Sequence, residues 1–183
     1  MTSILKVNQI QDIGGNTILL SDGSGNITQS KAGITEADQW RLTAVTNTST
    51  DADVTTNWER VDTTGWSGIG TGLTESSGIF SFPQTGIYLI TFQGSFSVSA
   101  SDSYLALQLQ ITTDNSTYNI CASSDVGNRS TAGASIEASS SQFIFDVTNI
   151  TTHKFKFSTT NFLTGSSLSG NTDYNRTAVS VIR

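Results

Sequence analysis

The side chains that could perform chemistry are few in this chain. His153 is the only histidine and Cys121 the only cysteine among the 183 residues. A Ser-His-Asp arrangement is formally available in a chain this rich in serine, but no Gly-X-Ser-X-Gly sequence is present to hold a nucleophilic serine. We therefore expect His153 to occupy a surface or strand-edge position and Cys121 to be a buried structural thiol within a strand.

Carboxylates offer a second kind of chemistry, because two acids about 5–10 Å apart across a cleft can cleave a glycosidic bond. Asp51 and Asp53 lie in a threonine-rich stretch, and Glu59 and Asp62 flank a short strand pattern. None of the four is embedded in apolar sequence that would raise the pKa of its carboxyl group. We therefore predict that the protein is not an enzyme and has no catalytic residues.

Metal-ligand chemistry has one faint signal. Residues 22–26 (Asp-Gly-Ser-Gly-Asn) space oxygen atoms two residues apart, as a calcium loop does, but the later bidentate glutamate of such a loop is missing. A turn explains the same residues without a metal. One histidine and one cysteine are too few for a zinc site, so we expect no metal and no cofactor.

Composition and charge exclude further classes of protein. Nine lysine and arginine residues against 15 acids give a net charge of −6, and nucleic acid requires clustered positive charge, so we expect no nucleic-acid partner. We find no run of about 18 apolar residues, and therefore expect no membrane insertion. We also expect no signal peptide and, with a single cysteine, no disulfide within the chain.

The elements that position these side chains are strands. Serine and threonine total 55 residues, and β-branched and aromatic residues alternate with polar ones, a pattern typical of antiparallel strands. The best helical candidate is residues 33–40, with Thr35 as N-cap, which predicts a connector of at most two turns. We predict an all-β sandwich with strands near residues 40–45, 58–62, 79–82, 86–99, 104–113, 118–122, 135–147, 153–157 and 177–182.

The chain divides near residue 38. Before it, short apolar pieces alternate with Gly-Asn turns, and none is long enough to bury itself. We predict that residues 1–38 attach to other copies or to another protein and that residues 39–183 form a head domain; a loose tail is the alternative. The apolar side chains that would make the attachment are Leu5, Val7, Ile10, Ile13, Ile18 and Leu20.

One predicted strand has apolar residues on both faces. Along residues 87–98 the even positions, from Tyr88 to Val98, form an apolar face that suits a sandwich core. The odd positions begin with Ile87 and Leu89 and then become polar. An exposed strand face should not carry isoleucine and leucine, so this end is expected to meet another subunit or a covering loop.

The stretch Phe80-Ser-Phe-Pro-Gln-Thr-Gly-Ile-Tyr-Leu-Ile-Thr-Phe92 resembles a signature of the ten-stranded jelly roll. Two related families share it, namely the globular head of the complement recognition protein (complement-one-q) and the tumour-necrosis-factor-like ligands. The resemblance implies an antiparallel jelly-roll head that forms a homotrimer. The strand positions that it places at the trimer interface are Ile87, Leu89, Thr91 and Gln93.

The same resemblance leaves one alternative open for metals, because complement-like heads sometimes hold calcium. Loop acids such as Asp102 or Asp114 are the residues that could do so here. The chain departs from both families in having no collagen-like stalk, no signal peptide and no disulfide pair. We therefore do not expect a secreted animal ligand.

The N-terminal segment carries a second resemblance. Residues 4–12 (Ile-Leu-Lys-Val-Asn-Gln-Ile-Gln-Asp), with Gly-Gly-Asn-Thr at 14–17 and Gly-Ser-Gly-Asn-Ile at 23–27, resemble the opening of many tail-fibre and other virion proteins of marine bacteriophages, cyanophages in particular. The resemblance implies docking to other virion proteins through residues 1–38. It also implies assembly in the reducing host cytoplasm and exposure on the particle surface.

Aromatic side chains near turns are the remaining binding candidates. Trp66, Tyr118 and Tyr174 are placed where they could contact a host-surface glycan or protein; the alternative for Trp66 is that it packs over the end of the sandwich. We predict a non-enzymatic virion protein whose trimeric head attaches a tail fibre to the host through several weak sites. A capsid-decoration or tail-assembly protein with no receptor is the alternative, and a tail-borne glycosidase is the weakest one.

Overall fold

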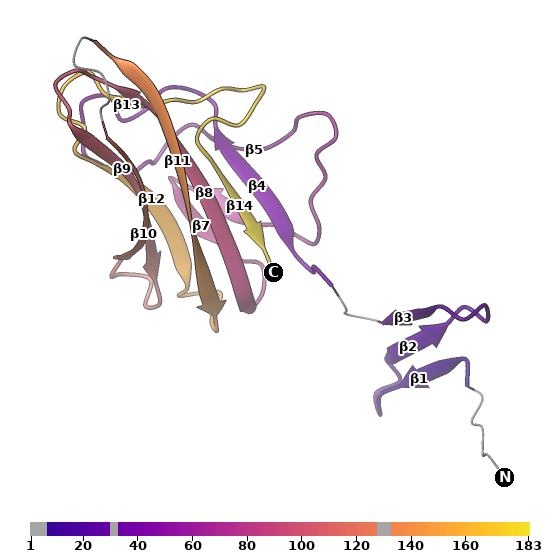
Figure 1. Ribbon diagram of the computed structural model, residues 1–183. Helices are drawn as coiled ribbons and strands as arrows, with labels where there is room; N and C mark the ends of the chain where they lie inside the picture. Colours follow the sequence, from indigo (N-terminus) through magenta and orange to yellow (C-terminus); the bar gives the residue numbers. More distant parts are fainter. Residues whose placement is uncertain (1–6, 30–32, 128–132) are drawn as a thin grey trace. The chain divides into compact units, whose positions relative to one another are not determined.

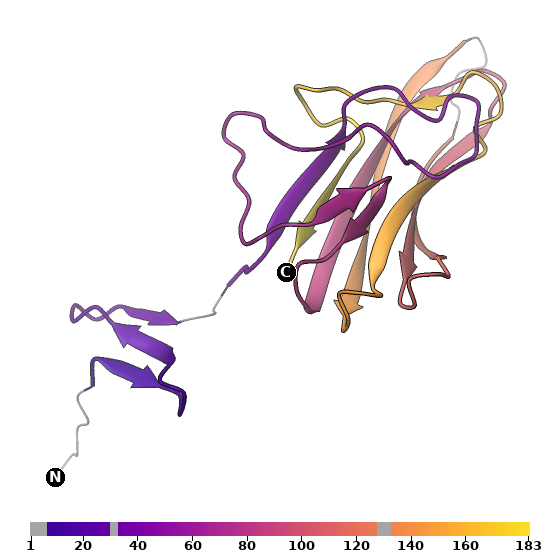
Figure 2. The ribbon, with the colours of Figure 1, turned by 180° about the vertical axis from the view of Figure 1, so that it is seen from behind.

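The computed structural model describes residues 7–29, 33–127 and 133–183. The chain forms two compact units, Met1–Thr35 and Glu36–Arg183, and the regular elements of the described residues are all strands (Figures 1 and 2). The division falls just before the predicted boundary between residues 38 and 39. Within the described ranges we find no helix that could cross a membrane.

The N-terminal unit is a small antiparallel sheet with the strand order β1-β2-β3. None of residues 7–27 is buried, so this described part of the unit contributes no core. A three-stranded sheet without a buried face gains little hydrophobic stabilisation. Its strands are β1 (Gln9–Gln11), β2 (Thr17–Ser21) and β3 (Ile27–Gln29).

The two turns of this sheet are built alike. Asp12 accepts hydrogen bonds from two backbone N–H groups that follow it, and its other oxygen accepts one from the side chain of Asn16 at 2.9 Å. Asp22 and Asn26 repeat the arrangement, with a side-chain bond of 2.6 Å. The asparagine side chain and the backbone N–H groups favour the charged carboxylate and lower the pKa of both aspartates.

The head is a sandwich of two antiparallel sheets (Figure 1). One has the order β10-β9-β12-β7-β6 and the other β11-β8-β14-β4-β5, with β13 paired to β8 outside this path. Most neighbours are not consecutive along the chain, because the chain crosses between the sheets as in a jelly roll. The predicted all-β sandwich is therefore confirmed. The strands of the head are β4 (Ala37–Leu42), β5 (Trp58–Arg60), β6 (Thr74–Ser76), β7 (Ile79–Ser81), β8 (Gly86–Val98), β9 (Tyr104–Thr112), β10 (Asn119–Gly127), β11 (Ser135–Val147), β12 (Lys154–Thr160), β13 (Ser167–Leu168) and β14 (Ala178–Ile182).

The predicted helical connector at residues 33–40 is wrong. Strand β4 begins at Ala37 and is hydrogen-bonded to β14 on one side and to β5 on the other. The helical signal rested on Thr35 as an N-cap and on few residues. Hydrogen bonds along both edges of β4 satisfy the backbone N–H and C=O groups of this segment. This pairing outweighs the weak local preference for a helix.

The core lies between the sheets and is dominated by aromatic rings. Phe80 of β7 is fully buried, stacks on Phe155 at 4.8 Å between ring centroids, and meets the edges of Trp58 at 5.2 Å and Trp40 at 5.6 Å. The even positions of β8 point into the same core, as predicted, and all are buried. These positions are Tyr88, Ile90, Phe92, Phe96 and Val98.

Candidate functional site

The outer face of the β11-β8-β14-β4-β5 sheet carries an apolar row that no described residue covers. Leu89 of β8 is directly opposite Ile144 of β11 on one side and Ile182 of β14 on the other. The side chain of Ile144 is 66% exposed and that of Ile182 39%, whereas Leu89 between them is half-buried. We call Ile144, Leu89 and Ile182 the apolar row. Ile87, 57% exposed, extends it along β8.

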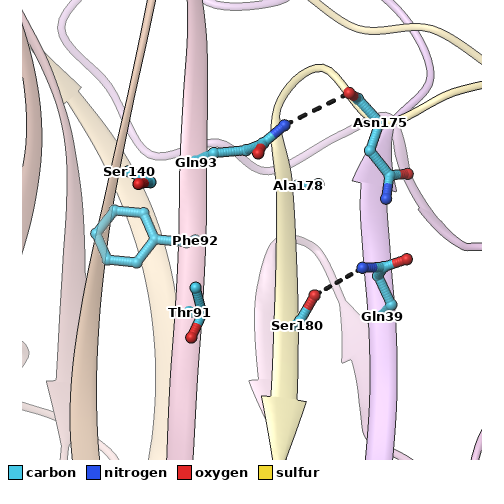
Figure 3. A pocket seen from close by; sticks show the side chains of 8 residues that line it. All are labelled: Gln39, Thr91, Phe92, Gln93, Ser140, Asn175, Ala178 and Ser180. Carbon is cyan, nitrogen blue, oxygen red and sulfur yellow. Dashed lines mark hydrogen bonds between the residues drawn. The ribbon is translucent and has the colours of Figure 1, made fainter.

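Next to the apolar row the same face becomes polar and slightly hollow (Figure 3). Thr91 and Gln93 of β8 line this shallow hollow together with Gln39 and Ser180. Ser180 accepts a hydrogen bond of 2.7 Å from Gln39, and the amide of Gln93 donates to the carbonyl oxygen of Arg176 at 2.6 Å. These groups are uncharged, and the nearest charge on the apolar side of the face is the carboxylate of Asp146, which lies opposite Ile87.

The four residues predicted to form a trimer interface therefore share one exposed face. Ile87, Thr91 and Gln93 are exposed, and Leu89 is half-buried. Two of them belong to the apolar end and two to the polar hollow. Their position agrees with the alternation predicted for this strand, while their contact with another subunit stays a prediction.

A second hollow lies beside the first, where two loops of the head meet. Residues 61–73, between β5 and β6, project from the edge of the sandwich (Figures 1 and 2), and residues 169–177 lead into β14. We call this site the Trp66–Tyr174 hollow, and Gln39 and Asn175 belong to it as well as to the first hollow. Its volume is about 290 Å³. The loop residues that line it include Thr63, Thr64, Trp66, Asp173, Tyr174 and Asn175.

The position of Trp66 is set by two glycines. The N–H of Trp66 donates to the carbonyl of Thr63 at 3.0 Å, and Gly65 between them has a φ of 92°, which a turn of this kind requires. The ring of Trp66 packs on Gly68, where an added Cβ would come within 3.3 Å of the ring and 3.2 Å of a carbonyl oxygen. Trp66 is half-buried as a result, so it packs against its own loop and still faces the hollow.

A fully buried arginine, Arg41, holds Thr63, one of the residues that line the Trp66–Tyr174 hollow. Arg41 of β4 donates to Glu59 at 2.6 and 3.0 Å, to Asp62 at 2.5 Å and to Thr63 at 2.6 Å. The hydroxyl of Thr63 in turn donates to the carbonyl of Asp173 at 3.1 Å. This chain of hydrogen bonds ties the first loop to the second and leaves both with a defined shape.

Trp66 and Tyr174, two of the three aromatic candidates, thus come together, and the third does not. Tyr118 lies at the start of β10 in the other sheet, with the Lys156 ammonium 4.5 Å from its ring centroid. Burial and the nearby Asp53 carboxylate raise the pKa of Tyr118. No sequence pattern pairs Asp173 or Asn175 with Trp66, because the two loops are more than a hundred positions apart.

His153 has a structural position. It lies directly before β12, as the strand-edge prediction had it, but it is buried and not on the surface. Its two ring nitrogens are each 3.1 Å from a threonine hydroxyl, those of Thr148 and Thr152. Its ring stacks on Phe145 with 5.5 Å between centroids. Both nitrogens are therefore already hydrogen-bonded within the fold.

Cys121 lies in β10 at a bulge of that strand. Its thiol is half-buried, contacts the core cluster, and has a carbonyl oxygen of Leu109 at 3.5 Å. Burial disfavours the thiolate and raises the pKa of Cys121 to about 11. The prediction of a structural thiol agrees with this environment.

Cys121 is expected to resist alkylation in the native protein. The thiolate is the reacting form, and a pKa about two units above the usual value leaves ~100-fold less thiolate at pH 8. Iodoacetamide labelling followed by mass spectrometry should therefore be slow for the folded chain and fast in denaturant. Equal labelling rates in the two states would contradict the placement of this thiol.

The acids considered as catalytic candidates form ion pairs and hydrogen bonds within the head. Glu59 and Asp62 both bind Arg41, and Asp53 forms an ion pair of 2.6 Å with Lys156. Asp51 accepts the backbone N–H of residue 162 at 2.8 Å. Each of the four therefore has a hydrogen-bond or ion-pair partner within the head, and the absence of a catalytic pair stays a prediction.

The two loop acids considered as calcium ligands, Asp114 and Asp102, differ in their hydrogen bonds. Asp114 accepts the N–H groups of Thr117 and Ser116 and the hydroxyl of Thr112, which lowers its pKa. Asp102 is buried; one of its oxygens accepts backbone N–H groups and the other has no hydrogen-bond partner. No cluster of three or more His, Cys, Asp or Glu side chains suited to a metal occurs among the described residues.

The apolar residues predicted to dock the N-terminal unit are exposed where they are described. Leu5 lies outside the described residues. Ile10, Leu19 and Ile27 line one face of the small sheet, and Ile18 points to the other face. Apolar groups on both faces of a sheet without a core are expected to be covered by other protein. The exposed docking candidates are Val7, Ile10, Ile13, Ile18 and Leu20.

Comparison with solved structures supports the fold. The tumour necrosis factor Eiger from S. frugiperda superposes with a TM-score of 0.61 at 16% identity, over 80% of this chain and 90% of that one. Murine APRIL superposes with a TM-score of 0.58 at 15% identity, over 81% of this chain and 98% of that one. No protein-family model and no curated protein matches the sequence. The head therefore has a jelly-roll fold like that of tumour necrosis factor, and identities this low show the fold alone.

Proposed function

We propose that the protein is a non-enzymatic, homotrimeric binding head that its N-terminal unit attaches to a phage virion. The observation that supports the trimer is the apolar row on the outer sheet face, where the neighbouring groups of β8 and β14 are uncharged. Ile144, Leu89 and Ile182 lie side by side, and in one chain Ile144 and Ile182 are exposed while Leu89 between them is half-buried. A protein gains about 1.5–3 kcal/mol by burying each such side chain, so a partner surface is expected there.

We expect two further copies of this chain to form the partner surface. Beside the apolar row this face carries threonine, serine and glutamine, with one carboxylate, Asp146, opposite Ile87 at its end; the centres of protein interfaces are likewise poor in charge. Strand β11 is an edge strand and exposes both Ile136 and Ile144. An uncovered apolar edge promotes aggregation unless it is paired or buried. A closed trimer would cover the edge and the face together.

The virion placement is supported by the N-terminal unit. Residues 7–27 form strands and turns without a buried side chain, so the sheet depends on other protein for its hydrophobic stabilisation. The sequence of this unit resembles the opening of phage tail-fibre and virion proteins. A trimer would present three copies of it to the particle, and the heads would face outward for attachment to the host.

A capsid-decoration or tail-assembly role without a receptor is the second candidate. The described strands of the N-terminal unit form a compact sheet and not an extended shaft, which favours this role. Immunogold labelling of purified particles with an antibody against residues 40–183 separates the two. Gold at the tail tip supports host attachment, and gold spread over the shell supports decoration.

Deletion of residues 1–35 is expected to leave a folded head that no longer joins particles. Deletion of residues 1–38 is expected to destabilise the head by at least about 2 kcal/mol, because it removes two buried acids. Glu36 binds the amide of Gln84 at 2.7 Å, and Asp38 binds the N–H of Leu73 at 2.7 Å and the guanidinium of Arg60 at 3.1 Å. Urea unfolding and particle incorporation measure the two effects.

The shorter deletion also tests the attachment. A head lacking residues 1–35 that still co-purified with particles would show that the head, and not the N-terminal unit, holds the protein there. A shorter deletion that failed to fold would contradict the division at Glu36.

A further inference from the structure

We propose that the Trp66–Tyr174 hollow binds one neutral sugar ring of a surface glycan. This inference rests on the proposed function as a binding head and names the ligand class of one of its sites. The two aromatic residues come from different loops, 61–73 and 169–177, yet both line the same concavity. Binding sites formed by convergent loops on a rigid sandwich are a common use of this architecture.

The lining combines the two kinds of group that a sugar requires. A pyranose has C–H groups that pack on an aromatic face and hydroxyls that both donate and accept hydrogen bonds. Trp66 and Tyr174 supply aromatic surface, and Tyr174 is 52% exposed. Asp173 and Asn175 supply a planar carboxylate and a planar amide, and Thr64 adds a hydroxyl.

The charges around the hollow select against anionic ligands. No lysine or arginine lines it, and the exposed residues at its rim include the carboxylate of Asp173. Two cations next to its lining are already engaged. Arg41 is paired with Glu59 and Asp62. The guanidinium of Arg176 donates to the hydroxyl of Tyr174 at 3.1 and 3.3 Å and lies 5.5 Å from its ring centroid. A phosphate or a carboxylated sugar would meet negative charge without a compensating cation.

One buried acceptor in the hollow has no partner within the described residues. The side-chain oxygen Oδ1 of Asn175 is buried and accepts no hydrogen bond, although a buried polar atom normally has one. In Figure 3 the side chain of Asn175 extends toward Gln39, which lines the same hollow. Because this oxygen is buried, a ligand hydroxyl in the hollow would reach it after the Asn175 side chain rotates toward the ligand.

The hollow is formed before any ligand binds. Arg41 holds Thr63 at 2.6 Å, and Thr63 holds the backbone of Asp173 at 3.1 Å. Asn171 accepts the N–H groups of Asp173 and Tyr174 at 2.8 and 3.2 Å, which closes the turn of the second loop. Preformed sites avoid the cost of ordering loops on binding.

The size of the hollow limits the ligand to a small unit. Its volume of about 290 Å³ lies at the lower end of ligand pockets, ~300 Å³, and it is open on one side. We expect a single ring to bind with a Kd of about 1 mM or weaker. Three such sites in a trimer would strengthen attachment to a surface that carries many copies of the sugar.

The test is ligand-observed NMR with the full-length protein. The probes are the methyl glycosides of glucose, galactose, mannose and N-acetylglucosamine, with sialic acid and methyl phosphate as anionic probes. We expect saturation transfer to at least one neutral glycoside and none to the two anions. Trp66→Ala and, independently, Tyr174→Ala are expected to weaken the binding at least tenfold, and Tyr118→Ala, an aromatic outside the hollow, to leave it unchanged.

Measuring the oligomeric state of each variant shows whether only the sugar site is wrong or the proposed trimeric binding head is wrong as well. Each variant is sedimented in parallel, so a trimer that binds no neutral glycoside overturns the sugar site and leaves the binding head standing. A monomer that fails to bind overturns both. Binding that persists in both the Trp66→Ala and the Tyr174→Ala variants, or that favours the anions, also overturns the site.

Discussion

The substitution Leu89→Asp is expected to convert the trimer into a folded monomer. Leu89 is the centre of the apolar row, between Ile144 and Ile182. In a trimer its side chain would be desolvated, and an unpaired carboxylate in such a place costs about 3–5 kcal/mol per copy. Sedimentation velocity at matched protein concentration should show the mass of one chain, and far-ultraviolet circular dichroism should show unchanged β structure.

Two further variants control this result. Ile144→Asp changes a side chain that is 66% exposed in the single chain, so it should split the trimer without disturbing the monomer core. Ile150→Asp changes an exposed isoleucine in the turn between β11 and β12, outside the proposed contact, and should leave the trimer intact. If both row variants sedimented as trimers, the subunits would have to meet through another surface.

The substitution Phe80→Ala is expected to cause the largest loss of head stability. The ring is fully buried and contacts Trp40, Trp58 and Phe155, with centroids 4.8–5.6 Å apart. Removing a buried phenylalanine costs about 3–5 kcal/mol, a large share of the ~5–15 kcal/mol that stabilises a typical domain. Guanidinium unfolding followed by tryptophan fluorescence measures the loss.

Phe143→Ala is the matched control for this prediction. Phe143 of β11 is only half-buried, and its single ring contact is with Phe145 at 6.3 Å. We expect less than about half the effect of Phe80→Ala, because the cost scales with the volume left unfilled. Because unfolding of a trimer depends on concentration, the variants are compared at one protein concentration. Equal losses would show that Phe80 is not at the centre of the core.

Much of the fold could be predicted from local sequence. The period of two along β8 correctly placed Tyr88, Ile90 and Phe92 in the core and Ile87 on the outer face, since a strand alternates sides whatever its partners are. The segment that begins with Thr35 was assigned wrongly, because its strand is stabilised by pairing with β14 and β5, which lie far away in sequence. Short strands such as β6 and β13 were missed for the same reason.

Single residues of the candidate site could be recognised from the sequence, but not the fact that they lie together in the fold. Trp66 and Tyr174 were recognisable as aromatics near turns, but their meeting depends on the crossing of two loops and on the hydrogen bonds of Arg41. That arginine lies on the outward face of β4 and is buried by Glu59, Asp62 and the loop that follows them. From the sequence, Glu59 and Asp62 are recognisable only as carboxylates that flank a short strand. Their role as partners of a buried cation depends on contacts that no spacing rule describes.

Sedimentation equilibrium of the unaltered full chain tests the central claim most directly. The account predicts a single species with three times the 19.4 kDa mass of the chain, which persists on dilution to about 1 μM. Such a species would show that the face carrying the apolar row, or an equivalent surface, is buried between subunits. A monomer of 19.4 kDa across the concentration range would contradict the trimeric binding head.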